Sequence, residues 1–135
     1  MDISQIFDKG LPASNEIFSN TVWVNMLVPD EKSVFDTQVY NVTFEPSART
    51  NWHSHPGGQI LLCMKGSGYY QEKGKPSRLL KEGDIVNIPP AVVHWHGASP
   101  KNRFIHLGMS TQLHLGPAVW LGPVTDQEYA EATSK

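Results

Sequence analysis

The sequence of 135 residues contains a single cysteine, Cys63, so no disulfide can form within one chain. Disulfide frameworks are typical of small extracellular domains, and we therefore expect a protein of a reducing compartment, located in the cytoplasm. Cys63 lies within the apolar run Ile60–Met64. This environment favours a small buried hydrophobic residue over a catalytic nucleophile.

Long hydrophobic runs and clustered charges are also missing. No window approaches the roughly 18 apolar residues that span a bilayer, and Met1–Gln5 lacks the basic and apolar stretches that open a secretion signal. Lys and Arg are scattered singly in a chain whose formal net charge is -2. A nucleic-acid-binding protein needs a basic stripe. We expect no membrane or nucleic acid partner, and a small molecule as the substrate.

The residues that are abundant predict one domain made of short strands. Apolar runs rich in Val, Ile and aromatic residues alternate with turn formers, and these runs span residues 22–28, 34–44, 59–65, 68–71, 84–88, 92–94 and 104–109. Many short strands with evenly spaced turns predict an all-β sandwich or barrel. Thr125 followed by Glu128 has the pattern of a capping box, which predicts a short C-terminal helix. We expect an N-terminal arm (1–20), a barrel (21–124) and a C-terminal helix with its tail (125–135).

Three histidines in two segments form a candidate metal site. His53 and His55 are separated by one residue, and because strand side chains alternate, both imidazoles are expected on the same face. His94 supplies a third imidazole from a later strand, and imidazole suits divalent transition metals. Gln59 follows His55 across Pro56-Gly57-Gly58, which can bend the strand so that the amide carbonyl faces the imidazoles.

This set of donors carries no charge. A dication held by three imidazoles and one amide keeps its full charge and is a stronger Lewis acid than one bound to a carboxylate, so it favours an alkoxide or enolate. Four donors leave two positions of an octahedron open, as a catalytic metal requires. His96 and His106 are candidates for proton transfer, because an imidazole can accept or donate a proton near neutrality. His114 stands apart from these residues, and Trp52, Trp95 and Trp120 are interpreted as packing residues.

The spacing of these residues resembles the two motifs of the cupin superfamily, small β-barrels that bind one metal. The first motif corresponds here to Ser47, His53-x-His55, Gln59 and Gly66, and the second to Gly83, Pro89-x-Ala91, His94 and Ala98. Ser47 and Ala91 replace glycines of the pattern, and Ala98 replaces an asparagine. Gln59 replaces a glutamate, a departure that changes the metal chemistry. The resemblance implies a single-domain cupin barrel of the jelly-roll type.

A closer resemblance is to single-domain bacterial cupins that include manganese-dependent hydroxynitrile lyases and carboxymuconolactone-decarboxylase-associated cupins. It covers the segments 42–59, 83–86 and 94–98 and the later pair His106-Leu107. The resemblance implies one divalent metal, Mn(II) in preference to Fe(II), Ni(II) or Zn(II), bound by His53, His55, Gln59 and His94. It places His96 and His106 at the substrate cavity as catalytic residues and implies a homodimer or higher homo-oligomer.

In general terms, this resemblance implies a metal-dependent enzyme that acts on a small hydroxy or carbonyl compound. The specific reaction expected is that of a lyase that cleaves a cyanohydrin to an aldehyde or ketone and HCN. The candidates for the wall of the substrate cavity are Tyr40, Val42, Phe44, Leu61, Cys63 and Ser110. Two alternatives stay open. The same site with Fe(II) can serve a dioxygenase, and a cupin can bind a small molecule without catalysis.

Overall fold

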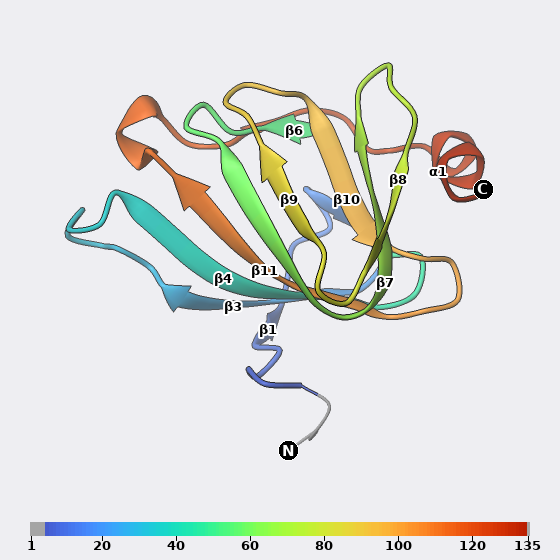
Figure 1. The fold of residues 1–135 in the computed structure, drawn as a ribbon, viewed down its shortest axis with the longest axis horizontal. Coiled ribbons are helices and arrows are strands. Elements are labelled where there is room, and N and C mark those ends of the chain that lie inside the picture. Colours follow the sequence, from blue (N-terminus) through green and yellow to red (C-terminus); the bar gives the residue numbers. More distant parts are fainter. Residues whose placement is uncertain (1–4, 135) are drawn as a thin grey trace.

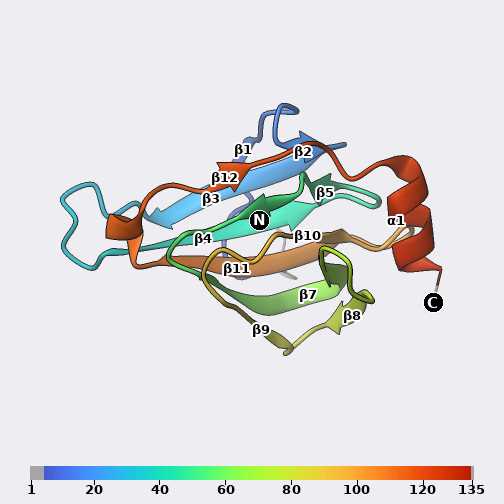
Figure 2. The same ribbon diagram turned by 90° about the horizontal axis from the view of Figure 1, so that it is seen from above.

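The computed structural model describes residues 5–134 as a strongly curled antiparallel sheet whose two halves face each other (Figures 1 and 2). The strands are β1 (Leu11–Pro12), β2 (Phe18–Ser19), β3 (Val22–Val28), β4 (Thr37–Phe44), β5 (Arg49–Thr50), β6 (His53–Ser54), β7 (Gln59–Glu72), β8 (Arg78–Lys81), β9 (Ile85–Ile88), β10 (His94–Ala98), β11 (Phe104–Thr111) and β12 (Val119–Trp120). A 3-10 turn, η1 (Leu113–Leu115), and one helix, α1 (Asp126–Thr133), follow β11. The predicted all-β fold with a short C-terminal helix is confirmed.

The long strand β7 joins the two halves of the sheet. Its first part, residues 59–66, pairs with β11 and β9, and its second part, residues 67–72, pairs with β10 and β8. The sequence pattern predicted two separate strands here, and this prediction was wrong. Gly66 has a φ of 77°, and a Cβ atom at this position would lie 1.9 Å from the carbonyl oxygen of Arg103. Glycine therefore lets the chain turn into the second half without ending the strand.

The hydrophobic core lies between the two halves. Inward-facing side chains from both halves are almost fully buried, among them Val42, Phe44, Leu61, Leu80, Val86 and Phe104. Cys63 belongs to this core, and burial raises the pKa of its thiol to about 11. The thiol is therefore protonated near neutrality, and the interpretation of Cys63 as a buried hydrophobic residue agrees with this environment.

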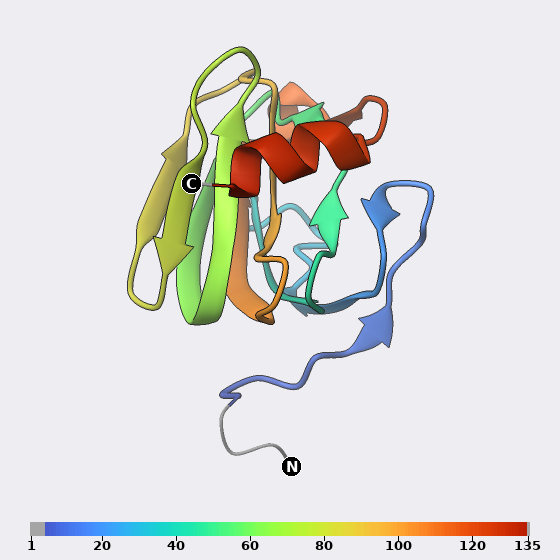
Figure 3. The same ribbon diagram turned by 90° about the vertical axis from the view of Figure 1, so that its right-hand side faces the viewer.

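Helix α1 covers the outer face of the second half, where it lies against β7 (Figure 3). The capping box is present: the Thr125 hydroxyl accepts a hydrogen bond from the Glu128 amide, and the Glu128 carboxylate accepts one from the Thr125 amide. Beneath the helix lies a second apolar cluster, formed by Trp52, Tyr69, Trp95, Val124, Tyr129 and Ala132. No helix in the described part of the chain has the length and hydrophobicity needed to cross a membrane.

Segments near both ends of the described chain pack against the sheet. β1 pairs with β3, and β2 pairs with β5 through Phe18 opposite Thr50. β12 pairs with β6 and places Trp120 opposite His53. Residues 11–19 thus lie on the barrel of their own chain.

Two turns keep the backbone that glycine favours although glycine is absent. Ser47 has a φ of 71° and Ala91 a φ of 65°, so both lie in the left-handed region that side chains with a Cβ rarely adopt. The Ser47 amide donates to the carbonyl of Ser99, and the Ala91 amide donates to the carbonyl of His55. These bonds hold the two turns at the positions where the motifs carry glycine.

We expect Arg49→Ala to lower the free energy of unfolding by about 2 kcal/mol, because hydrogen bonds to charged groups contribute about 1.5–3 kcal/mol. The buried Arg49 guanidinium donates to the Val124 carbonyl at 2.8 Å and to the Asp126 carboxylate at 2.9 Å, and it lies 4.4 Å from the Tyr129 ring centroid. It therefore fastens α1 to the sheet. Urea unfolding followed by tryptophan fluorescence measures the loss.

The matched control is Arg78→Ala, because Arg78 is exposed and its hydrogen bond to the Ile85 carbonyl is long, at 3.4 Å. This variant is expected to change the free energy of unfolding by less than about 0.5 kcal/mol. Equal losses in the two variants would contradict the role of Arg49.

Candidate metal centre

The histidines of the two motifs meet because β6 and β10 are paired. His53 lies opposite His94 in this pairing, with 4.3 Å between the ring centroids. The ring of His55, just beyond β6, lies 5.1 Å from that of His53 and 5.9 Å from that of His94. Gln59 begins β7 after a turn in which the Gly58 amide donates to the His55 carbonyl. The structure thus brings together all four residues expected to bind the metal.

The turn between His55 and Gln59 needs its glycines for two reasons. A Cβ atom on Gly57 would lie 2.0 Å from the carbonyl oxygen of Thr111, and Gly58 has a φ of 91°. The chain therefore passes against the end of β11 before it enters β7. This path returns the Gln59 side chain to the imidazoles.

Strand β10 alternates between the interior and the outer face. His94 and His96 are both buried and their rings lie 5.7 Å apart, whereas Trp95 points to the opposite side and packs under α1. The period of two along a strand thus places both imidazoles of β10 in the interior.

Backbone carbonyls fix the orientation of two imidazoles. The Nδ1 atoms of His53 and His94 lie 2.9 Å from the carbonyl oxygens of Asn51 and Val92, respectively. Burial lowers the pKa of His94 to about 4 and that of His53 well below its ordinary value, so both rings are neutral near pH 7. A neutral imidazole has one N–H, which Nδ1 donates to the carbonyl, and Nε2 is left with a lone pair. This is the form in which histidine binds metals.

The contact between His94 and Gln59 joins two acceptors. The Nε2 lone pair of His94 faces the Oε1 atom of Gln59 at 3.2 Å, and the other end of this amide donates to the Tyr40 hydroxyl. No proton is available for this contact, so the two atoms repel each other unless a cation lies near both. The buried Nε2 atom of His55 also has no hydrogen-bond partner within residues 5–134. Burial lowers the pKa of His55 to about 4, so it too offers a lone pair. The residues present therefore fit a divalent cation.

His96 and His106 form a pair next to these residues. His106 Nε2 lies 3.2 Å from His96 Nδ1, and the rings are 4.8 Å apart. His96 also lies close to His53 and His94: one ring nitrogen from each of the three residues lies within 4.8 Å of the other two. Burial lowers the pKa of His106 to about 4 and that of His96 well below its ordinary value. The buried Nε2 atom of His96 has no hydrogen-bond partner in the described part of the chain.

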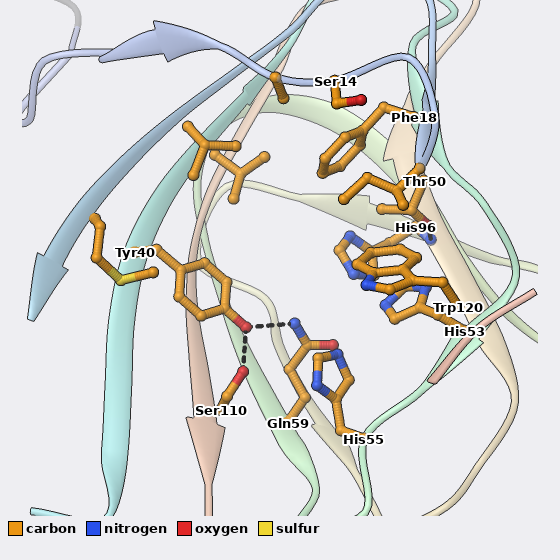
Figure 4. A pocket seen from close by; sticks show the side chains of 15 residues that line it. Ser14, Phe18, Tyr40, Thr50, His53, His55, Gln59, His96, Ser110 and Trp120 are labelled. Atoms are coloured by element: carbon orange, nitrogen blue, oxygen red, sulfur yellow. Dashed lines mark hydrogen bonds between the residues drawn. The ribbon is translucent and has the colours of Figure 1, made fainter. Parts of the chain in front are cut away.

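A pocket of about 330 Å³ opens beside the histidines. Figure 4 shows His53, His96 and Trp120 close together along one side and Tyr40, Ser110, Gln59 and His55 away from them. The rest of the wall is formed by Ala13, Ser14, Ile17, Phe18, Val24, Met26, Val42 and Thr50. None of the 15 residues that line the pocket is charged.

The wall differs in part from the one considered in the sequence. Tyr40, Val42 and Ser110 line the pocket, whereas Phe44, Leu61 and Cys63 are core residues outside its lining. His106 is fully buried behind His96 and does not line the pocket.

Sequence reasoning missed the wall contributed by the two ends of the chain. Phe18 and its neighbours carry no motif, and Trp120, interpreted as a packing residue, stacks on His53 at 4.5 Å between ring centroids. Their only signal is hydrophobicity, which does not distinguish a pocket wall from a core. His114 lies outside the site, exposed and paired with Asp36.

Comparisons with known proteins support these observations. A family model described as "Cupin domain" matches residues 40–104. The (R)-mandelonitrile lyase of Granulicella tundricola is 39% identical over 128 residues, which is 93% of either chain. Acireductone dioxygenase 4 of Oryza sativa subsp. japonica is 30% identical over 80 residues, 56% of this chain and 41% of that protein. The crystal structure of a cupin-like protein from Thermotoga maritima is 62% identical, with a TM-score of 0.95, and covers 96% of this chain and 97% of its own.

Proposed function

The chain belongs to the cupin family, and from this membership we propose that it is a metal-dependent lyase that cleaves a cyanohydrin to a carbonyl compound and HCN. The metal ligands in this proposal are His53, His55, Gln59 and His94. The proposed cofactor is one divalent transition-metal ion, and Mn(II) is proposed in preference to the others. The relative named as a mandelonitrile lyase, which aligns along nearly the whole chain, supports the reaction.

The observation that carries the proposal is the contact between two acceptors, His94 Nε2 and Gln59 Oε1. None of the residues that line the adjoining pocket has a carboxylate. A bound divalent ion would act as a Lewis acid that lowers the pKa of a substrate hydroxyl and stabilises the alkoxide. Because none of the donors is charged, the ligands themselves do not compensate the positive charge of the ion.

His96 and His106 are proposed as the groups that carry the proton. His96 lines the pocket, its Nε2 atom has no hydrogen-bond partner among residues 5–134, and its Nδ1 atom contacts His106. When His96 takes the hydroxyl proton at Nε2, it can release its Nδ1 proton to His106 Nε2. The hydroxyl oxygen then forms the carbonyl double bond as the bond to the nitrile carbon breaks, and the reverse proton transfer converts the departing cyanide to HCN. The protein returns to its starting state, so His106 acts as the base through His96.

The pocket wall defines the part of the substrate that does not react. Its volume of about 330 Å³ and its uncharged, largely apolar and aromatic wall suit a small neutral compound with an apolar substituent. Phe18, Val42 and Trp120 contribute to that wall.

The test is a mandelonitrile cleavage assay on fully metallated wild type, His96→Ala and His106→Ala. Both variants are expected to retain metal and to lose about 10²–10⁴-fold in kcat, the usual contribution of general acid–base catalysis. Elemental analysis of the same samples measures the metal. His114→Ala, which changes an exposed histidine, serves as the control. A fully metallated wild type without cleavage above background would refute the assignment.

Similarity to acireductone dioxygenases favours one alternative, an iron-dependent dioxygenase. The Mn(II) and Fe(II) forms should therefore be assayed without oxygen as well. Activity that persists anaerobically excludes a dioxygenase, whereas activity that requires oxygen supports one. Tight binding of a small molecule without turnover would instead indicate a non-catalytic cupin.

A further inference from the structure

We propose that Tyr40 is a positioning residue that determines which end of the Gln59 amide faces the metal site. The inference rests on the assignment of Gln59 as a ligand in the proposed function. It concerns a residue outside both cupin motifs.

The hydrogen bonds of Tyr40 hold the amide in the orientation that the structure shows. Gln59 Nε2 donates to the Tyr40 hydroxyl at 2.7 Å, and the hydroxyl lies 2.7 Å from the Ser110 hydroxyl (Figure 4). Since the Tyr40 oxygen accepts from the amide, its own proton is free for Ser110. The NH2 end of Gln59 is thus held on the side of Tyr40, and Oε1 is turned toward His94.

The orientation matters because the two ends of an amide have nearly the same shape and opposite chemistry. The carbonyl oxygen offers lone pairs to a cation, whereas the NH2 group offers only donors. Rotation by 180° would place the NH2 group at the site and remove one ligand. The glutamate of the cupin pattern has two equivalent oxygens and needs no such control, so the requirement arises with Gln59.

A second observation concerns the space that Tyr40 occupies. Its ring crosses β11 directly over Gly108, where a Cβ atom would lie 2.2 Å from Tyr40 Cε2. Only glycine at this position lets the ring approach β11, whose next inward-facing residue, Ser110, lies within hydrogen-bonding distance of the hydroxyl. The ring is thus held in place by the strand beneath it.

The experiment is a double-mutant cycle that measures Mn(II) affinity by calorimetry, with no substrate present. Tyr40→Phe is expected to weaken Mn(II) binding by about 10–100-fold, as is usual when the partner that orients a ligand is removed. In the Gln59→Glu background, the same substitution is expected to change the affinity by less than about 3-fold, because either oxygen of a carboxylate can bind the metal.

The matched control is Tyr69→Phe, which removes a hydroxyl from another buried tyrosine that lies under α1, away from the site. It should leave Mn(II) affinity unchanged. Equal weakening by Tyr40→Phe in both backgrounds would assign Tyr40 a merely structural role and overturn the inference, as would unchanged affinity with Gln59 present. Absence of Mn(II) binding by the wild type would overturn it together with the ligand assignment. Intact Mn(II) binding without cyanohydrin cleavage would refute the proposed reaction alone, because the cycle contains no substrate.

Discussion

The His94→Ala variant is expected to bind Mn(II) at least about 10³-fold more weakly than the wild type, because loss of even an outer-shell partner of a ligand typically weakens binding 10–100-fold. His94 is fully buried, its Nδ1 atom is fixed by the Val92 carbonyl, and its Nε2 atom faces Gln59. Calorimetry and elemental analysis of the purified variant measure the loss.

Metal binding also stabilises the folded chain by mass action, which provides a second measurement. Added Mn(II) should raise the melting temperature of the wild type and leave that of His94→Ala unchanged. His114→Ala should behave like the wild type, because His114 is exposed and pairs with Asp36 outside the site. Circular dichroism establishes that His94→Ala is folded. Wild-type Mn(II) affinity in the folded variant would remove His94 from the ligand set.

The Gly66→Ala variant is expected to lose about 4 kcal/mol or more of its free energy of unfolding, a loss seen only for a few mechanisms such as backbone strain and overpacking. Gly66 has a φ of 77°, which is unfavourable for alanine by itself, and the added Cβ atom would lie 1.9 Å from a backbone oxygen of Arg103. Backbone atoms cannot move away without opening the pairing of β7 with β11. Urea unfolding measures the loss, and failure to accumulate folded protein is its extreme form.

Gly74→Ala separates the two contributions. Gly74 has nearly the same φ, 80°, but no atom lies within 4 Å of the position that its Cβ would take. The expected loss is therefore about 1–2 kcal/mol, the cost of the left-handed conformation alone. Similar losses in the two variants would show that crowding at Gly66 does not matter.

The parts of the fold that could be predicted from the sequence are those governed by neighbours along the chain. Alternation along a strand accounts for the burial of His94 and His96 on one side of β10 and of Trp95 on the other. The cap formed by Thr125 and Glu128 depends on residues three positions apart, and it predicted the helix correctly.

The parts that were missed depend on contacts between distant segments. The pattern around Gly66 could not distinguish a strand that ends from one that continues into the other half of the sheet. The distinction depends on the close approach of the Arg103 carbonyl, which is distant in the sequence. The hydrogen bonds that Tyr40 forms with Gln59 and Ser110 link three strands, and no local pattern reports them. The proposed ligand set follows from a spacing in the sequence, whereas the residues proposed to orient it are brought there by the tertiary structure.

The two ends of the chain close the pocket through very short pairings, which has a consequence for how the site forms. β2 and β12 each contribute two residue pairs to the sheet, while β7 and β11 pair along most of their lengths. Short edge pairings open at a lower free energy than central strands. The centre of the barrel can therefore be intact while Phe18 and Trp120 are still detached. While these two segments are detached, the interior histidines that they cover are open to solvent.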